Sequence, residues 1–192
     1  MSIDQGIHFL HQNGLNIFLS TKVNLLPPEI FPFSEDQKNK TLVLIGAGGK
    51  TLWSKLDLSK PDPFDTFTLN QMNWFGKTIL HQEIEIIFPH ENVILPLQKL
   101  SRYFNFSHQS PIGIDISEEF GLWFSYRGIF LIEGDFPEIK FESTKSICEA
   151  CIERPCLLVT DILNARIKCP IKNQYQYSYE QMEYHKSVIS KL

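Results

Sequence analysis

Apolar residues along the chain recur with two periods, one typical of helices and one typical of strands. Helical spacing or capping signals predict four helices, at residues 4–12, 68–81, 96–104 and 178–190. Apolar runs and alternation predict strands at residues 16–20, 41–45, 83–88 and 122–133. These elements alternate irregularly, without a strict βαβ repeat. We therefore expect an α+β fold: a single domain with a mixed or antiparallel sheet flanked by helices.

The longest predicted strand, LWFSYRGIFLIE at residues 122–133, contains an arginine. Alternation along a strand divides its first residues between one face, with Trp123, Ser125 and Arg127, and the opposite face, with Leu122, Phe124 and Tyr126. A buried cation requires a partner. Arg127 is therefore expected either to hold an anionic group of a ligand or to pair with a carboxylate such as Glu118, Glu119 or Glu133.

The segment TLVLIGAGGKTLW at residues 41–53 has the form of a phosphate-binding loop. The P-loop pattern G-x-x-x-x-G-K-[ST] would require a glycine at the position of Leu44. The dinucleotide pattern G-x-G-x-x-G would require one at Thr51. Since each pattern lacks one glycine, we expect a strand, a glycine turn and a short helix. A nucleotide-binding enzyme that uses residues 46–51 stays an alternative.

Composition narrows the class of protein. The 192 residues are 43% hydrophobic and 21% charged, which suits one well-packed domain. The net charge of −4 gives no electrostatic reason to bind nucleic acid or an anionic membrane. The first residues lack the pattern of a signal peptide, and no apolar run approaches the roughly 18 residues of a membrane-spanning helix. We expect a cytoplasmic protein whose partners are neither nucleic acids nor membranes.

All four cysteines fall within one short segment, as Cys148, Cys151, Cys156 and Cys169. In a cytosolic protein this clustering favours a metal over disulfides. Zinc is most often held by two C-x2-C pairs, but only Cys148 and Cys151 form such a pair. A closing Cys-Pro is typical of bacterial ferredoxins, which favours an iron–sulfur cluster. A zinc site and free cysteines packed as small apolar residues are the alternatives.

Three segments together resemble a group of bacterial ferredoxin-like proteins. They are FGLWFSYRGIFLIEG at residues 120–134, CEACIERPC at 148–156 and CPIKNQYQYSYEQMEYH at 169–185. This group is distantly related to the cobalamin-processing protein of methylmalonic aciduria with homocystinuria and to epoxyqueuosine reductase. The first and third segments are similar to the cobalamin-processing protein, and the cysteines are similar to the ferredoxin end of the reductase.

The resemblance implies a nitroreductase-like fold with a cleft for a large planar redox cofactor, such as cobalamin. It places Trp123, Tyr126 and Arg127 at this cleft. It also brings the turn with Gly46, Gly48 and Gly49 close to the ligand, where the absence of a side chain permits backbone contact. A cluster of the 4Fe-4S type would relay single electrons to the ligand, and a further protein would supply them.

The cysteines depart from the ferredoxin pattern at one position. Thr160 stands where that pattern places its fourth cysteine, so Cys169 would be the fourth ligand. Three tyrosines that alternate with polar residues either stack on a flat ligand or anchor the terminal segment: Tyr175, Tyr177 and Tyr179. His185 in the last helix is either a surface or hydrogen-bonded histidine, or a fifth type of ligand or a proton donor.

The sequence therefore predicts two parts of the chain and two classes of function. We expect an α+β cofactor-cleft domain at residues 1–145 and a cysteine-rich metal-binding segment with the terminal helix at residues 146–192. The principal hypothesis is a redox protein, a reductase of the cobalamin-processing or epoxyqueuosine-reductase type. The alternative is a non-enzymatic domain in which a structural zinc, or no metal, occupies the cysteines.

Overall fold

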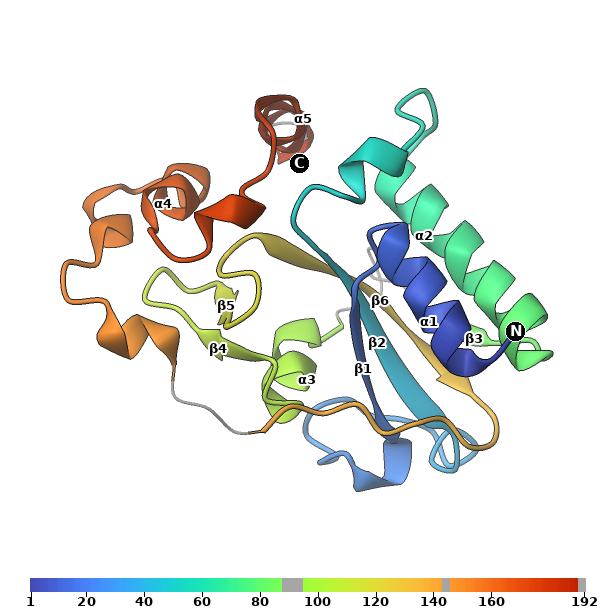
Figure 1. Ribbon diagram of the computed structural model, residues 1–192. Helices are drawn as coiled ribbons and strands as arrows, with labels where there is room; N and C mark the ends of the chain where they lie inside the picture. The colour runs from blue at the N-terminus through green and yellow to red at the C-terminus, as the bar shows by residue number, and fades with distance from the viewer. Residues whose placement is uncertain (88–94, 143–145, 190–192) are drawn as a thin grey trace.

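An antiparallel sheet of four strands forms the centre of the computed structural model, which describes residues 1–87, 95–142 and 146–189 (Figure 1). The order across the sheet is β1 (Ile17–Lys22), β2 (Thr41–Gly48), β6 (Phe124–Ile132) and β3 (Glu85–Ile87). A separate antiparallel pair consists of β4 (Ser107–Gln109) and β5 (Asp115–Ser117). All described pairings between strands are antiparallel, which is the second of the two sheet types expected.

Helices cover both faces of this sheet. On one face lie α1 (Ile3–Gln12) and α2 (Pro63–Trp74), and the latter continues as a π-helix over Phe75–Leu80. On the other face lies α3 (Leu97–Tyr103). The C-terminal segment adds α4 (Ile162–Lys168) and α5 (Tyr179–Ile189), which lie beside the start of β6 (Figure 1). Five short 3-10 helices complete the described elements: Val23–Leu25, Trp53–Lys55, Ile147–Ala150, Pro155–Leu158 and Asn173–Tyr175.

Strand β2 is buried along its whole length and divides the core in two. Val43 and Ile45 face α1 and α2, whereas Leu42 and Leu44 face α3. All four are fully excluded from water. Burying an aliphatic side chain of this size contributes about 1.5–3 kcal/mol, so the two cores together stabilise one compact α+β domain. No helix in the described parts of the chain has both the length and the apolar character needed to cross a membrane.

A β-bulge in β6 sets the direction of its polar end. Ile45 pairs with Gly128 but Gly46 pairs with Tyr126, so Arg127 is the extra residue of the bulge. Arg127 and Ser125 line one cavity, whereas Phe124 and Tyr126 pack into the core beneath α3. The two faces of this stretch are therefore those that alternation predicts.

Several predicted boundaries differ from the structure. The glycine turn was expected from Gly46, but β2 continues through Gly48. The side-chain amide of Asn16 holds this end of the strand, because it accepts from the N–H of Gly48 and donates to its carbonyl. The helix expected at 68–81 begins at Pro63, because proline suits a first helical turn. The strand predicted at residues 83–88 and the helix predicted at residues 178–190 each end at a residue, 88 and 190, that lies outside the described residues.

Replacing Gly48 with alanine is expected to lower the free energy of unfolding by about 1–3 kcal/mol, as overpacking does. A Cβ atom at this position would stand 2.4 Å from the ring of Phe120. That ring is buried and packs edge-on against Tyr175, with 5.0 Å between the centroids. Urea unfolding of Gly48→Ala in the wild-type and Phe120→Ala backgrounds measures the effect. The loss should nearly vanish in the second background, and an equal loss in both would contradict this packing.

Candidate functional site

A cavity of about 680 Å³ lies between β6, α4 and α5. Its wall combines residues that are distant in sequence: Ser125 and Arg127 from β6, Ile162 and Arg166 from α4, and His185 from α5. Cavities of this size hold small-molecule ligands and cofactors in other proteins. We call it the β6–α4–α5 cavity.

Arg127 lines this cavity and forms a long ion pair with Asp65. Its Nη1 is 3.8 Å from Oδ1 of Asp65, and only 16% of its side chain is exposed. Its Nε donates to the carbonyl of Tyr126, and its guanidinium stands 5.1 Å from the ring centroid of Phe64. Burial raises the pKa of Asp65, and Arg127 opposes this shift. The partner is therefore on α2 and is none of the carboxylates named as examples from sequence: Glu118, Glu119 and Glu133.

Arg166 is a site residue that sequence reasoning missed. Its guanidinium carbon stands 4.9 Å from the ring centroid of Trp123 and 4.8 Å from that of Tyr177, so Arg166 makes two cation–π contacts. Its Nε and Nη2 are buried and have no hydrogen-bond partner in the described parts of the chain. The sequence shows only that Arg166 lies one helical turn after Ile162, and that spacing does not predict which side chains contact its guanidinium.

His185 completes the polar part of the cavity. Its ring stacks on Phe64 at 5.3 Å and lies 5.5 Å from Tyr177. Its Nε2 is buried and lacks a hydrogen-bond partner among the described residues. Burial, followed by the charges of Arg127 and Arg166, lowers the pKa of His185 to about 4. The imidazole is therefore neutral at pH 7.

The lowered pKa of His185 predicts acid sensitivity. Between its ordinary value of 6.5 and about 4, the unfolded chain binds a proton that the folded chain does not bind. The free energy of unfolding should therefore fall as pH falls through this window, by about 1–2 kcal/mol after allowing for partial exposure. Urea unfolding between pH 7.5 and 4.5 measures this slope.

Two variants isolate the contribution of His185 to this slope. His185→Phe should flatten it, because the new ring keeps the aromatic contacts but does not titrate. The control is His81→Asn, which changes an exposed residue with positive φ, a conformation that asparagine tolerates. An unchanged slope in His185→Phe would contradict the assignment.

The four cysteines lie near one another: Cys148, Cys156 and Cys169 pack in one apolar cluster, and Cys151 is an electrostatic neighbour of this cluster. Cys148 lies in the 3-10 helix Ile147–Ala150 and Cys151 follows it, Cys156 lies in the next 3-10 helix, and Cys169 directly follows α4. Cys156 and Cys169 are buried, the other two are half-buried, and all four are free thiols. Burial and then the neighbouring thiols raise the pKa of Cys148, and Cys169 feels the same effects from the other three. Helix α4 spans the long gap in sequence and returns Cys169 to the others.

Four cysteine thiols are a donor set that suits either a zinc ion or an iron–sulfur cluster. As the side chains stand, no group of three or more His, Cys, Asp or Glu in the described residues is placed to hold a metal ion. Hydrogen bonds from Ser146 to Cys148 and from the N–H of Ile171 to Cys169 favour the thiolates. Thr160 is exposed and outside this cluster.

The cysteine cluster and the β6–α4–α5 cavity share α4 as a wall. Ala165 and Cys169 pack into the cysteine cluster, whereas Ile162 and Arg166 line the cavity. The two residues before β6 repeat this arrangement, since Leu122 packs beside the cysteines and Trp123 contacts Arg166. A group held by the cysteines would therefore lie one helix away from a ligand in the cavity.

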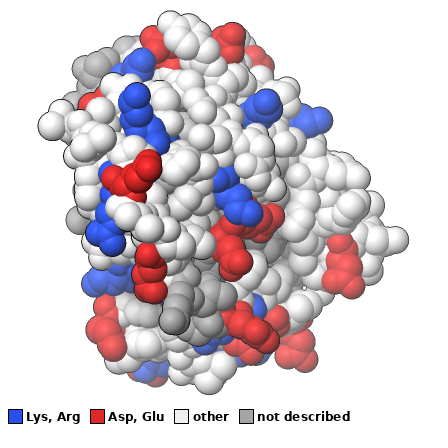
Figure 2. Space-filling model, turned by 60° about the vertical axis from the view of Figure 1, so that its left-hand side comes forward, with Lys and Arg blue, Asp and Glu red and all other residues white. Residues whose placement is uncertain are grey.

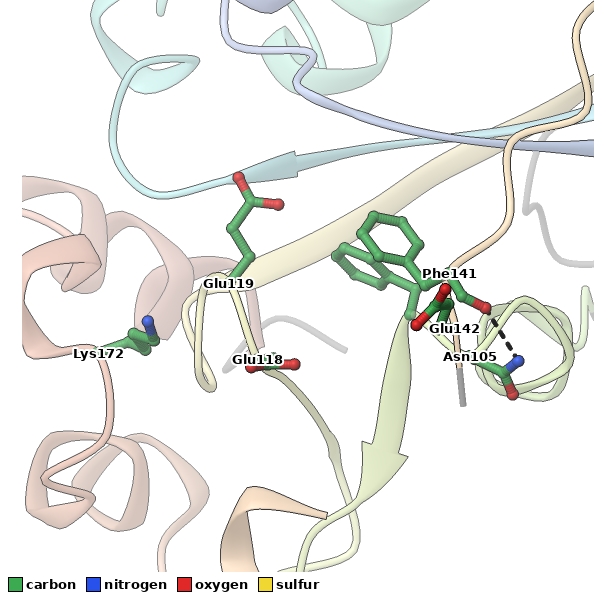
Figure 3. Close-up of a pocket in the computed structure, with 7 residues that line it drawn as sticks. Asn105, Glu118, Glu119, Phe141, Glu142 and Lys172 are labelled. Atoms are coloured by element: carbon green, nitrogen blue, oxygen red, sulfur yellow. Dashed lines mark hydrogen bonds between the residues drawn. The ribbon is translucent and has the colours of Figure 1, made fainter. Parts of the chain in front are cut away.

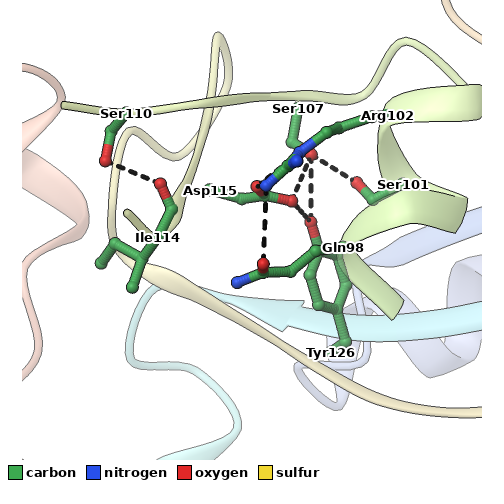
Figure 4. Close-up of polar contacts among 8 residues, drawn as sticks. All are labelled: Gln98, Ser101, Arg102, Ser107, Ser110, Ile114, Asp115 and Tyr126. Carbon is green, nitrogen blue, oxygen red and sulfur yellow. Dashed lines mark hydrogen bonds and ion pairs between the residues drawn. The ribbon is translucent and has the colours of Figure 1, made fainter. Parts of the chain in front are cut away.

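The other predicted cofactor residues lie elsewhere. Gly46, Gly48 and Gly49 are buried against the chain itself and do not line the cavity. The hydroxyl of Tyr126 points to the opposite face, where it donates to Asp115 at 2.8 Å (Figure 4). Of the six residues predicted to contact a cofactor, the cavity contains Arg127, and Trp123 reaches it through Arg166.

A second cavity, of about 370 Å³, has an acidic and aromatic wall (Figure 3). Glu118 and Glu119 approach it from one side, Lys172 lies near them, and Phe141 closes another side. Burial raises the pKa of Glu119, and Lys172 opposes this shift. All of these charged side chains are at least partly exposed, so water can satisfy them without a ligand.

Comparison of the chain with protein-family models and with curated proteins gave no match. The site must therefore be interpreted from its own geometry and chemistry.

Proposed function

We propose that this protein is a redox protein in which four cysteines hold an iron–sulfur cluster beside a cavity for a planar cofactor or substrate. One observation carries the proposal. Cys148, Cys156 and Cys169 pack together with Cys151 nearby, and this cluster shares α4 with the largest of the cavities described above. An electron-transfer site requires such a short path between the donor group and the acceptor.

The residues around the cysteines suit this role. Cys148, Cys151, Cys156 and Cys169 would bind the irons, and a bound cluster supplies one-electron chemistry. Hydrogen bonds to the sulfurs from Ser146 and the N–H of Ile171 favour a more negative cluster, which raises its reduction potential. The apolar side chains of Ile116 and Leu122 exclude water from the buried thiols.

The residues of the cavity suit a flat acceptor. Tyr177 lines the cavity and provides aromatic surface, and His185 is neutral at pH 7. We propose a nitroreductase-like arrangement, supported by the antiparallel sheet with helices on both faces and a cavity over β6. A cobalamin-like cofactor would exceed 680 Å³, so only part of its corrin would be enclosed.

An electron-donor protein would approach the surface of the cysteine-rich segment. Ile152 and Leu158 are 95% and 82% exposed there, and Leu157 and Ile162 are about half exposed. Figure 2 brings this side of the molecule forward and shows acidic and basic side chains interspersed with uncharged areas. Apolar contact, rather than a field of one sign, therefore suits the docking of such a donor.

A structural metal is the second candidate function. The 3-10 helix Ile147–Ala150 buries none of its residues, and Pro155–Leu158 buries only Cys156. A segment with so little apolar burial needs another source of stability, and zinc bound to the same cysteines would supply it.

Anaerobic reconstitution with ferrous iron and sulfide separates the two functions. The redox proposal predicts a brown protein with broad visible absorbance that bleaches when dithionite is added. A colourless protein that binds stoichiometric zinc would contradict it. Titration with hydroxocobalamin then tests the cofactor, because binding in the cavity should be weakened by Arg127→Gln and unchanged by Lys55→Gln, a substitution outside the cavity.

A further inference from the structure

We propose that Arg166 binds the acidic group, a carboxylate or phosphate, of an anionic ligand in the β6–α4–α5 cavity. This inference deepens the cavity half of the proposed function and rests on it, but does not require the cysteine cluster. The ligand would present two oxygens to the Nε and Nη2 of Arg166 and a flat or apolar body to the rest of the cavity.

The first support is the unpaired edge of Arg166. Its Nε and Nη2 are two N–H donors on the same edge of a planar group, shielded from water and without partners in the described residues. The guanidinium keeps its charge under all ordinary conditions. An unpaired buried cation is costly, so such an edge indicates a partner that arrives from outside the chain.

In a second arginine of this protein, Arg102, the same two donors are hydrogen-bonded to a carboxylate. Nε and Nη2 of Arg102 donate to Oδ1 of Asp115 at 2.9 and 2.5 Å (Figure 4). Carboxylates and phosphates match this fork of donors because their oxygens accept two parallel bonds. Arg166 has the equivalent two donors but no such carboxylate in the part of the chain that the structure describes, and it lines the cavity instead.

Aromatic rings fix the orientation of this guanidinium. Trp123 and Tyr177 lie within 4.9 Å of its central carbon and attract it through their π-faces. The two rings stand at 66° to each other, so they hold the guanidinium from two directions. The site is therefore organised before the ligand binds, which lowers the entropic cost of binding.

The charges around the cavity have an excess of cations. Arg127, Arg166 and Lys186 line it, and Asp161 is the acidic residue among the lining side chains. The carboxylate of Asp161 is engaged as the cap of α4, where Oδ1 accepts from the N–H of Leu163 at 2.9 Å. The nearby Asp65 is paired with Arg127. The acidic side chains that the structure describes at the cavity, Asp161 and Asp65, are therefore already engaged by other groups.

His185 would be the second contact of the acidic group. His185 lines the same cavity as Arg166, whose charge helps to keep the ring neutral, and its Nε2 lacks a hydrogen-bond partner among the described residues. An anion beside Arg166 and Arg127 would offset their charges and stabilise the imidazolium. Binding should therefore raise the pKa of His185, and an uncharged ligand should not.

Three small probes test the ligand class on the purified full chain: benzoate, phenyl phosphate and the uncharged benzamide. Titration followed by ¹H–¹⁵N NMR should show binding of one or both anions, with the stronger one identifying the preferred acidic group. Benzamide should bind at least about tenfold more weakly, since a charge-assisted pair contributes about 1.5–3 kcal/mol. Benzamide binding as tightly as both anions would overturn the proposal.

Variants of α4 assign the effect to Arg166. Arg166→Gln should weaken anion binding about tenfold or more, and Arg166→Lys should recover little because it lacks the fork. Lys168→Gln is the matched control, since it removes a cation from the same helix outside the cavity. An unchanged dissociation constant in Arg166→Gln, or an equal loss in Lys168→Gln, would overturn the assignment.

Arg166→Met separates binding from structure. Methionine keeps apolar contact with the two rings and removes the unpaired charge, so this variant should unfold at the same or a higher urea concentration. A large loss of stability would show that Arg166 serves the fold, and would overturn the proposal. Iron–sulfur absorbance is measured on the same samples. Its absence would contradict the redox proposal, whereas equal binding of the anions and benzamide would contradict this inference.

Discussion

Replacing Cys156 with serine is expected to reduce the iron content of the reconstituted protein by about tenfold or more, since loss of an outer-shell partner alone costs 10–100-fold in metal affinity. Cys156 is buried, and its thiol raises the pKa values of Cys148 and Cys169. A serine hydroxyl is a poor ligand for iron and cannot replace the thiolate. Iron analysis and the visible spectrum of the purified variant measure the effect.

Two further variants test which residue is the fourth ligand. Cys169→Ser should lose iron as Cys156→Ser does, because α4 returns Cys169 to the other thiols. Thr160→Ala is the matched control at the position that the ferredoxin spacing favours, and it should retain full iron content. Retention of iron in Cys169→Ser, or its loss in Thr160→Ala, would contradict the assignment of Cys169.

Replacing Asp115 with alanine is expected to lower the free energy of unfolding by about 3–5 kcal/mol, the range for breaking a buried ion pair. Asp115 is 5% exposed and accepts hydrogen bonds from Arg102, from Ser107 at 2.8 Å and from Tyr126 at 2.8 Å (Figure 4). Alanine would leave one cation and two hydroxyls without this acceptor. Chemical unfolding in urea measures the loss.

Graded variants distinguish the charge from the hydrogen bonds. Tyr126→Phe removes one donor and should cost about 1 kcal/mol, as a single hydrogen bond does. Asp115→Asn keeps an acceptor but loses the charge, so its cost should fall between the other two. A loss below about 1 kcal/mol in Asp115→Ala would show that the network contributes little to the fold. The pKa of Tyr126 is raised by burial and then by Asp115, so its hydroxyl stays protonated and donates.

Local patterns predicted the principal elements well. Apolar periodicity identified α1, β1, β2, α3 and β6 because each depends mainly on which residues face the core. The strand alternation in β6 also separated Arg127 from Tyr126 correctly. Clustering in sequence brought attention to the cysteines, since Cys148, Cys151 and Cys156 occupy consecutive short turns.

Long-range pairing limited what the sequence could reveal about the site. Arg127 pairs with Asp65 because a bulge in β6 and the start of α2 meet in space, and neither event has a local signature. Arg166 and His185 come together only when α4 and α5 close over β6. The glycines at the end of β2 suggested a ligand loop, but Gly48 instead makes room for the ring of Phe120.

The most direct test of the central proposal is the metal and sulfide content of the protein isolated without oxygen. The proposal predicts iron and acid-labile sulfide in equal amounts, about four of each per chain for a 4Fe-4S cluster, with both lost in Cys156→Ser. One zinc per chain without sulfide, or no bound metal after reconstitution, would contradict it.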